Sequence, residues 1–90
     1  MELNKLSKEG RILRETIMEV VDNQVRDNDP PETRQTLERL MGEGISEEDA
    51  RIYIAQALCV EIWHAGVKNT EFNLERFVRN LENLPKEPQE

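Results

Sequence analysis

Residues 52–63 read Ile-Tyr-Ile-Ala-Gln-Ala-Leu-Cys-Val-Glu-Ile-Trp, and this stretch decides the fold. One glutamine and one glutamate are its only polar interruptions besides the tyrosine hydroxyl. A helix that is apolar on nearly every side belongs in the middle of a bundle of other helices. Ser46 precedes it as a potential cap, and three acidic residues follow that favour the positive end of a helix dipole. The sequence therefore predicts a central helix that begins after Ser46 and ends near Gly66.

Two helices are predicted before this central helix. Residues 3–27 contain one glycine and no proline, and their apolar residues recur at helical spacing. These residues are Leu3, Leu6, Leu13, Ile17, Val20, Val21 and Val25. Asp29 is the expected N-cap of the second helix, because a proline in the following position loses no intrahelical hydrogen bond. This second helix is expected to run to about Met41 and to stop at the glycines beyond it.

A fourth helix is predicted after the central one. Asn73 is its expected cap, and Pro85 ends it. A clean apolar stripe runs along it, formed by Leu74, Phe77, Val78, Leu81 and Leu84. The prediction is an all-α, four-helix bundle-like domain over residues 1–85, with the third helix at its centre. Residues 86–90 are expected to form a frayed polar tail.

Composition excludes several classes of protein. The chain has 90 residues, 12 basic against 19 acidic side chains and a net charge of −7, which disfavours binding to nucleic-acid phosphates. Cys59 is the single cysteine, so a disulfide framework and a multi-cysteine zinc site are excluded, and a reducing, cytoplasmic setting is expected. The charged start differs from a signal peptide, and no apolar run is long enough for a membrane span.

Glu61 and His64 form a Glu-x-x-His pattern, which places both side chains on one face of a helix. Ferritin-like di-iron sites use this spacing, but they need two such motifs, and His64 is the only histidine. A symmetric dimer would have to supply the second copy, with Glu15 or Glu19 as a further ligand. The alternative is a buried polar pair in which Glu61 bonds to His64 or to an arginine, because a carboxylate among apolar residues needs a partner.

No enzymatic motif is readable in the chain, and no cofactor is expected. Cys59 and His64 diverge by about 140° on a helix of 3.6 residues per turn, so they form no nucleophile–base pair. The four glycines match neither a phosphate-binding loop nor a dinucleotide fingerprint. The second and third predicted helices resemble a helix-turn-helix, but the acidic start of the third helix would meet phosphates with the wrong sign. A nucleic-acid-associated regulator is therefore the weakest of the functions considered.

Two resemblances to known families are visible. Residues 40–51, Leu-Met-Gly-Glu-Gly-Ile-Ser-Glu-Glu-Asp-Ala-Arg, resemble the first loop of ubiquitin-associated-type three-helix domains, although Ile45 replaces the usual aromatic residue and the following helix is longer. We interpret this as shared turn chemistry. Residues 29–33 (Asp-Pro-Pro-Glu-Thr), 44–46 (Gly-Ile-Ser) and 81–85 (Leu-Glu-Asn-Leu-Pro) resemble a small bacterial all-helical family of unknown function. That resemblance implies a bacterial cytosolic protein and no particular activity.

The function favoured by the sequence is a protein–protein interaction or structural module that self-associates as a homodimer. The long stripe of the first helix has little core to pack on in a chain of this size, and isologous pairing would bury it. The alternative is that the stripe packs on the third helix within one chain. Leu6, Leu13, Ile17 and Trp63 are the candidate interface residues. Metal binding by Glu61 and His64 across a dimer is the second hypothesis.

Overall fold

The helices form where apolar periodicity and capping residues place them. A computed structural model describes the backbone of residues 2–90 and the side chains of residues 14–90. Residues 2–90 contain no strand and form four α-helices, which are α1 (Glu2–Asp27), α2 (Pro31–Gly42), α3 (Glu47–Gly66) and α4 (Leu74–Asn83). The predicted all-α fold with four helices is confirmed.

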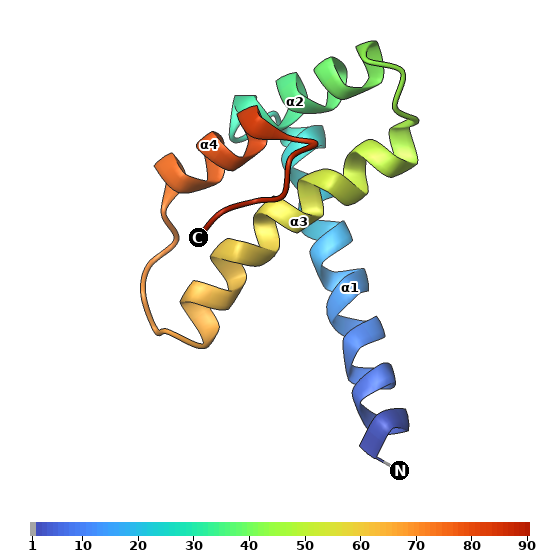
Figure 1. The fold of residues 1–90 in the computed structure, drawn as a ribbon, viewed down its shortest axis with the longest axis vertical. Helices are drawn as coiled ribbons and strands as arrows, with labels where there is room; N and C mark the ends of the chain where they lie inside the picture. Colours follow the sequence, from blue (N-terminus) through green and yellow to red (C-terminus); the bar gives the residue numbers. More distant parts are fainter. Residues whose placement is uncertain (1) are drawn as a thin grey trace.

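Helix α3 is the centre of the fold, as its composition predicts. It contacts α1, α2 and α4, and Figure 1 shows it crossing the middle of the molecule. Its buried residues include Ala50, Ile54, Ala57 and Leu58. They join a core to which the other helices contribute Ile17, Val21, Leu37, Leu40, Phe77 and Leu81, and Leu84 joins it just after α4. The small alanines of α3 allow neighbouring helices to approach it closely, which suits a helix covered on several sides.

Two of the three predicted helix caps are confirmed, and the third is wrong. The Ser46 hydroxyl oxygen accepts a hydrogen bond from the Asp49 amide at 3.1 Å. The Asn73 side-chain oxygen accepts one from the Arg76 amide at 3.0 Å. Asp29 is not the cap of α2. Pro30 takes that position in an extended conformation (φ −73°, ψ 153°), and the helix begins one residue later. The reason is local, because a residue that precedes a proline is pushed out of the helical region.

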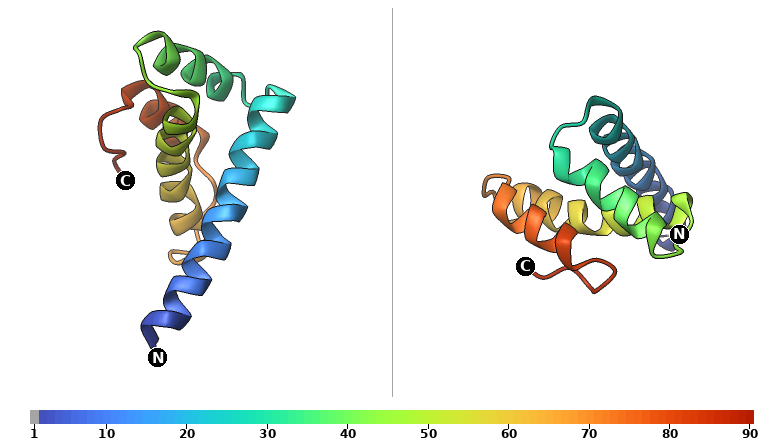
Figure 2. Two further views of the ribbon diagram at one scale, coloured as in Figure 1. Left: turned by 90° about the vertical axis from the view of Figure 1, so that its right-hand side faces the viewer. Right: turned by 90° about the horizontal axis from the view of Figure 1, so that it is seen from above.

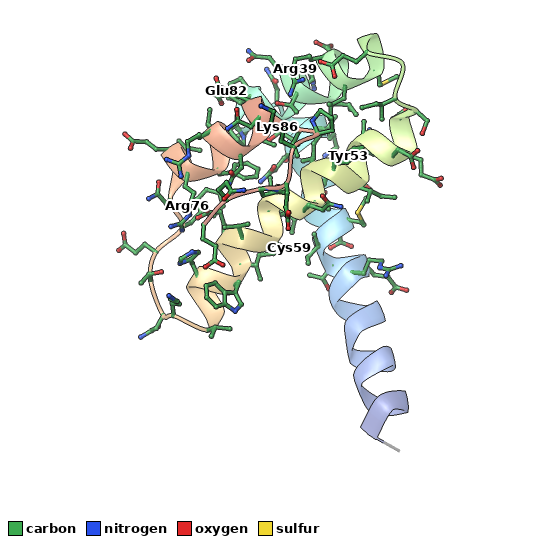
Figure 3. The ribbon with its side chains drawn as sticks, viewed as in Figure 1. Arg39, Tyr53, Cys59, Arg76, Glu82 and Lys86 are labelled. Carbon is green, nitrogen blue, oxygen red and sulfur yellow. The ribbon has the colours of Figure 1, made fainter. Side chains whose placement is uncertain are left out.

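Arginines of α2 hold the ends of two other helices. The Arg34 guanidinium donates to the Val25 carbonyl at 2.7 Å, at the C-terminus of α1. The Arg39 guanidinium donates to the Leu81 carbonyl at 3.0 Å, close to Glu82 at the C-terminal end of α4 (Figure 3). The last carbonyls of a helix lack intrahelical partners, and a cation there also complements the helix dipole. Helix α2 therefore connects the C-terminal ends of α1 and α4.

The molecule is elongated because α1 is longer than the core. Its N-terminal half projects beyond the other three helices in both side views (Figures 1 and 2). The C-terminal residues, by contrast, turn back beside α4 and α3 (Figure 1). A frayed tail is predicted over residues 86–90, whereas in the structure both backbone groups of Gln89 are hydrogen-bonded to Asn80. No helix among the described residues has the length and apolar character needed to cross a bilayer.

Candidate functional site

The most unusual group of the core is the Glu61 carboxylate. Glu61 lies on α3, is fully buried, and faces the start of α4. Arg76, near the N-terminal end of α4 (Figure 3), binds both of its oxygens: Nε to Oε2 at 2.6 Å and Nη2 to Oε1 at 2.9 Å. The backbone amide of Asn73 donates to Oε1 at 2.8 Å. The carboxylate thus joins the cap of α4 to α3 through three hydrogen bonds.

These partners keep Glu61 ionised. Burial by itself would raise the pKa of Glu61, but hydrogen bonds from Arg76 and the Asn73 amide outweigh it. Attraction to Arg76 and to His64 lowers the pKa further, and the net result is a pKa below the ordinary glutamate value. Of the two partners considered from the sequence, histidine or arginine, the structure places an arginine on the carboxylate.

His64 is turned toward the C-terminal residues. Its Nε2 lies 3.8 Å from Oε1 of Glu90, which is too long for a hydrogen bond, and this buried nitrogen has no other partner among the described residues. A metal ion bound by Glu61 and His64 would have to displace Arg76 from the carboxylate. The described residues contain no group of three or more histidine, cysteine, aspartate or glutamate side chains arranged for a metal. Metal binding across a dimer stays a prediction.

Trp63 lies at the surface near the end of α3. Its side chain is 39% exposed, so it is not packed in the core against α4, which is the alternative to an interface role. The Lys68 ammonium lies 5.1 Å from its ring centroid, and the His64 ring meets it edge-on at 5.1 Å. Val67, Phe72 and Leu74 are also exposed in the segment that follows. Trp63 is therefore available to a partner.

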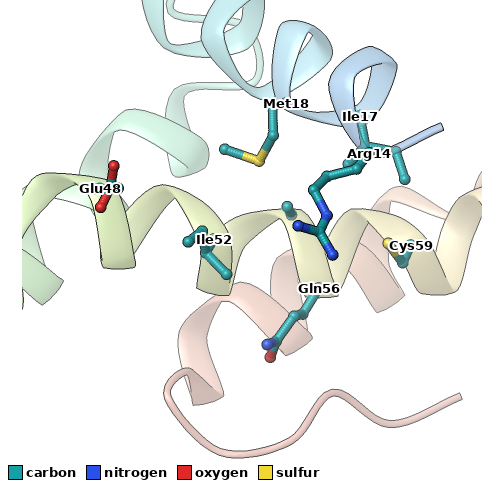
Figure 4. A pocket seen from close by; sticks show the side chains of 8 residues that line it. Arg14, Ile17, Met18, Glu48, Ile52, Gln56 and Cys59 are labelled. Carbon is teal, nitrogen blue, oxygen red and sulfur yellow. The ribbon is translucent and has the colours of Figure 1, made fainter. Parts of the chain in front are cut away.

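A groove lies between α1 and α3 on the described surface. Its volume is about 640 Å³, and Figure 4 shows side chains of both helices around it. Helix α1 contributes Arg14, Ile17 and Met18, and α3 contributes Glu48, Ile52, Ala55, Gln56 and Cys59. Ile17 is nearly buried at 6% exposure, whereas Ile52 is 45% exposed. We call this feature the α1–α3 groove.

The predicted interface residues fall in three places. Ile17 lines the α1–α3 groove, Trp63 lies apart from it, and the side chains of Leu6 and Leu13 lie outside the described residues. The sequence interpretation missed the face of α3 in the groove, although the spacing of Ile52, Ala55 and Cys59 is helical and was available as a signal. The sequence predicts that face to lie in the core, because nearly every position of the central helix is apolar.

Cys59 does not have the environment of a nucleophile. The residue is exposed on α3, but burial of its thiol in the groove wall raises the pKa of the thiol. A raised pKa lowers the fraction of reactive thiolate. A free cysteine on so apolar a helix is expected to be buried in the core, and this expectation is wrong, because Cys59 is exposed at the groove.

Comparison of the chain with known protein families, with characterised proteins and with solved structures finds no match. The two resemblances therefore depend on the quoted residues alone.

Proposed function

We propose that the protein is an interaction module that self-associates as a homodimer, with the projecting half of α1 in each copy packed on the α1–α3 groove of the other. The observation that carries this proposal is the amount of surface the single chain leaves exposed. The solvent-accessible surface is 6370 Å². A compact monomer of 10.5 kDa is expected to expose about 5,400 Å².

The excess is thus about 900 Å², close to the roughly 800 Å² that each partner buries in a standard protein–protein interface. The radius of gyration, 13.5 Å, is likewise larger than the value of about 12 Å expected for a compact domain of this length. Both quantities are those of an elongated molecule, whose principal-axis extents are 43, 28 and 25 Å. A chain of this size gains little stability from its own core, so burying the projecting helix against a second copy would add to it.

The distribution of charge favours a second copy as the partner. Residues 1–14 carry four basic and two acidic side chains, a net charge of +2, whereas residues 15–90 carry eight basic and 17 acidic side chains, a net charge of −9. The projecting half of α1 is therefore complementary in charge to the body of an identical chain. Complementary charges steer association and disfavour other orientations.

The α1–α3 groove offers apolar surface for this contact. Ile52 and Cys59 are exposed on its α3 side, and Met18 is half-buried on its α1 side. Arg14 and Glu48 provide charges of both signs at its edges. An apolar centre with a charged rim is the usual organisation of an interface. The apolar spacing in the first half of α1, from Leu3 to Leu13, supplies the matching stripe by sequence.

The test is the molar mass of the full chain, measured by light scattering on a size-exclusion column over a hundredfold range of concentration. We expect a mass of twice 10.5 kDa that falls toward the monomer on dilution. High salt should promote dissociation, because the charge complementarity is exposed to solvent and screened. A monomer at every concentration overturns the proposal.

Two matched variants locate the interface. Ile52→Lys places a charge in the groove and should yield a monomer, whereas Met41→Lys changes an apolar residue of α2 that is equally exposed, at 44% against 45%, but outside the groove. Met41→Lys should remain a dimer. If both variants dimerise like the unmodified chain, the interface lies elsewhere and the groove assignment is wrong.

A further inference from the structure

We propose that the surface of α4 around Asn80 is a binding site for an extended peptide segment in which an acidic residue follows the residue bound by Asn80, and that residues 86–90 of the chain occupy this site as a tethered ligand. This site is separate from the α1–α3 groove, so the inference does not depend on self-association.

Asn80 has an unusual position for an amide. It lies on the core side of α4, between Phe77 and Leu81, and its side chain is 1% exposed. Its Nδ2 donates to the Gln89 carbonyl at 2.8 Å, and its Oδ1 accepts from the Gln89 amide at 2.9 Å. One side-chain amide thus satisfies both backbone groups of a single residue. An extended residue presents its N–H and C=O on the same side, as in the paired residues of an antiparallel sheet.

Asn80 contacts the backbone of Gln89 and not its side chain. The Gln89 side chain is directed within its own segment, where its amide donates to the Glu87 carbonyl at 3.1 Å. Residues 86–90 are otherwise exposed, apart from partial burial of Pro88. Since the contacts do not require this particular sequence, another extended segment can make the same pair of hydrogen bonds with Asn80. Backbone recognition of extended peptides is a recurrent mode of binding.

The residue after the bonded position lies beside His64. Glu90 has a carboxylate oxygen 3.8 Å from Nε2 of His64, the buried nitrogen that lacks a hydrogen-bond partner. The Arg76 guanidinium itself is bound to Glu61 at 2.6 and 2.9 Å, which is the main reason its pKa is raised. Together Asn80 and His64 favour an extended backbone followed by an acidic side chain.

Residues 86–90 compete with free peptides for the site around Asn80, because they are tethered next to it. A short linker gives a bound segment an effective concentration on the order of millimolar, so a free peptide of equal affinity binds weakly while the tether is in place. Opening the site requires a change in residues 86–90 that leaves the helices untouched. Gln89→Pro does this, because proline has no N–H to donate to Asn80. Gln89→Ala is the matched control, since it retains both backbone groups.

The test uses nuclear magnetic resonance of the full ¹⁵N-labelled chain, with the pentapeptide Lys-Glu-Pro-Gln-Glu as the probe at up to about 10 mM, above the tether's effective concentration. In Gln89→Pro, we expect the resonances of the Asn80 side-chain amide to shift toward those of an exposed asparagine. Added peptide should then return these resonances to the chemical shifts of the unmodified chain, and the change should saturate with peptide concentration. In Gln89→Ala and in the unmodified chain, where residues 86–90 already occupy the site, the Asn80 side-chain amide should keep its position over the same range of peptide concentration.

Two further measurements complete the test. A peptide ending in Gln instead of Glu should bind Gln89→Pro more weakly, and the double variant Asn80→Leu, Gln89→Pro should not bind. The indole N–H of Trp63, next to His64, gives a second resonance for the same titration. The proposal is overturned if the peptide causes no saturable change in Gln89→Pro. It is equally overturned if Gln89→Ala opens the site, or if the Asn80→Leu double variant binds as well as Gln89→Pro.

Discussion

Glu61→Gln tests how far the buried ion pair stabilises the fold. The substitution retains the volume of the side chain but removes the charge that Arg76 contacts at 2.6 and 2.9 Å. Glutamine has one acceptor oxygen for three donors, and its own amide hydrogens point at the guanidinium or at the Asn73 amide. At least one charge-assisted hydrogen bond must therefore be lost from a fully buried position.

The loss of a hydrogen bond to a charged group costs about 2 kcal/mol. A 90-residue domain has a total stability of about 5–13 kcal/mol, so this is a substantial fraction. The melting temperature is expected to fall by about 8–16 °C. Urea unfolding followed by circular dichroism at pH 7 measures the difference. Glu43→Gln is the control, because Glu43 pairs with Arg39 at an exposed site, where loss of the pair costs less than about 1 kcal/mol.

The pH dependence of the stability difference shows whether the charge of Glu61 causes it. The pKa of Glu61 is lower in the folded chain than its ordinary value, so the ionised pair stabilises the fold above about pH 4.3, the pKa in the unfolded chain. This stabilisation is lost as the pH falls through the lower, folded pKa. The difference between the unmodified chain and Glu61→Gln should therefore shrink below about pH 4. A difference that stays constant from neutral to strongly acidic pH, or one no larger than that of Glu43→Gln, refutes the reasoning.

Three further outcomes are expected from unfolding measurements. Arg76→Met should destabilise the fold more than Glu61→Gln, since it leaves a buried carboxylate with the Asn73 amide as its remaining partner. Adding Glu61→Gln to Arg76→Met should restore part of the lost stability. Losses that are strictly additive in the double variant contradict this. Ser46→Ala should lower the free energy of unfolding by about 1 kcal/mol through loss of the α3 cap, and an unchanged value would mean that the cap is dispensable. Phe77→Ala should cost about 3–5 kcal/mol because Phe77 is fully buried, whereas Phe72→Ala, at 47% exposure, should cost far less; equal losses would contradict the burial argument.

The helices of this protein could be predicted from the sequence because local chemistry sets them. Apolar spacing, the caps Ser46 and Asn73 and the terminating glycines act within about one turn of helix, and each is readable without tertiary contacts. The start of α2 was predicted one residue too early, although the same local sequence held the signal: consecutive prolines keep the first of them out of the helix. The central position of α3 followed from its apolar composition.

The sequence also predicts that Glu61 needs a partner, because a carboxylate among apolar residues is costly to bury. It could not decide between His64, three residues away on the same helix, and an arginine farther along the chain. Arg76 reaches Glu61 only because the loop between α3 and α4 returns the start of α4 to this side of α3. The hydrogen bonds between Asn80 and Gln89 and the α1–α3 groove likewise depend on segments that are brought together by the tertiary fold. Local sequence thus determined the helices and their ends, whereas long-range packing decided which polar groups meet and which apolar surface stays open, because these depend on the path of the loops and the crossing of the helices.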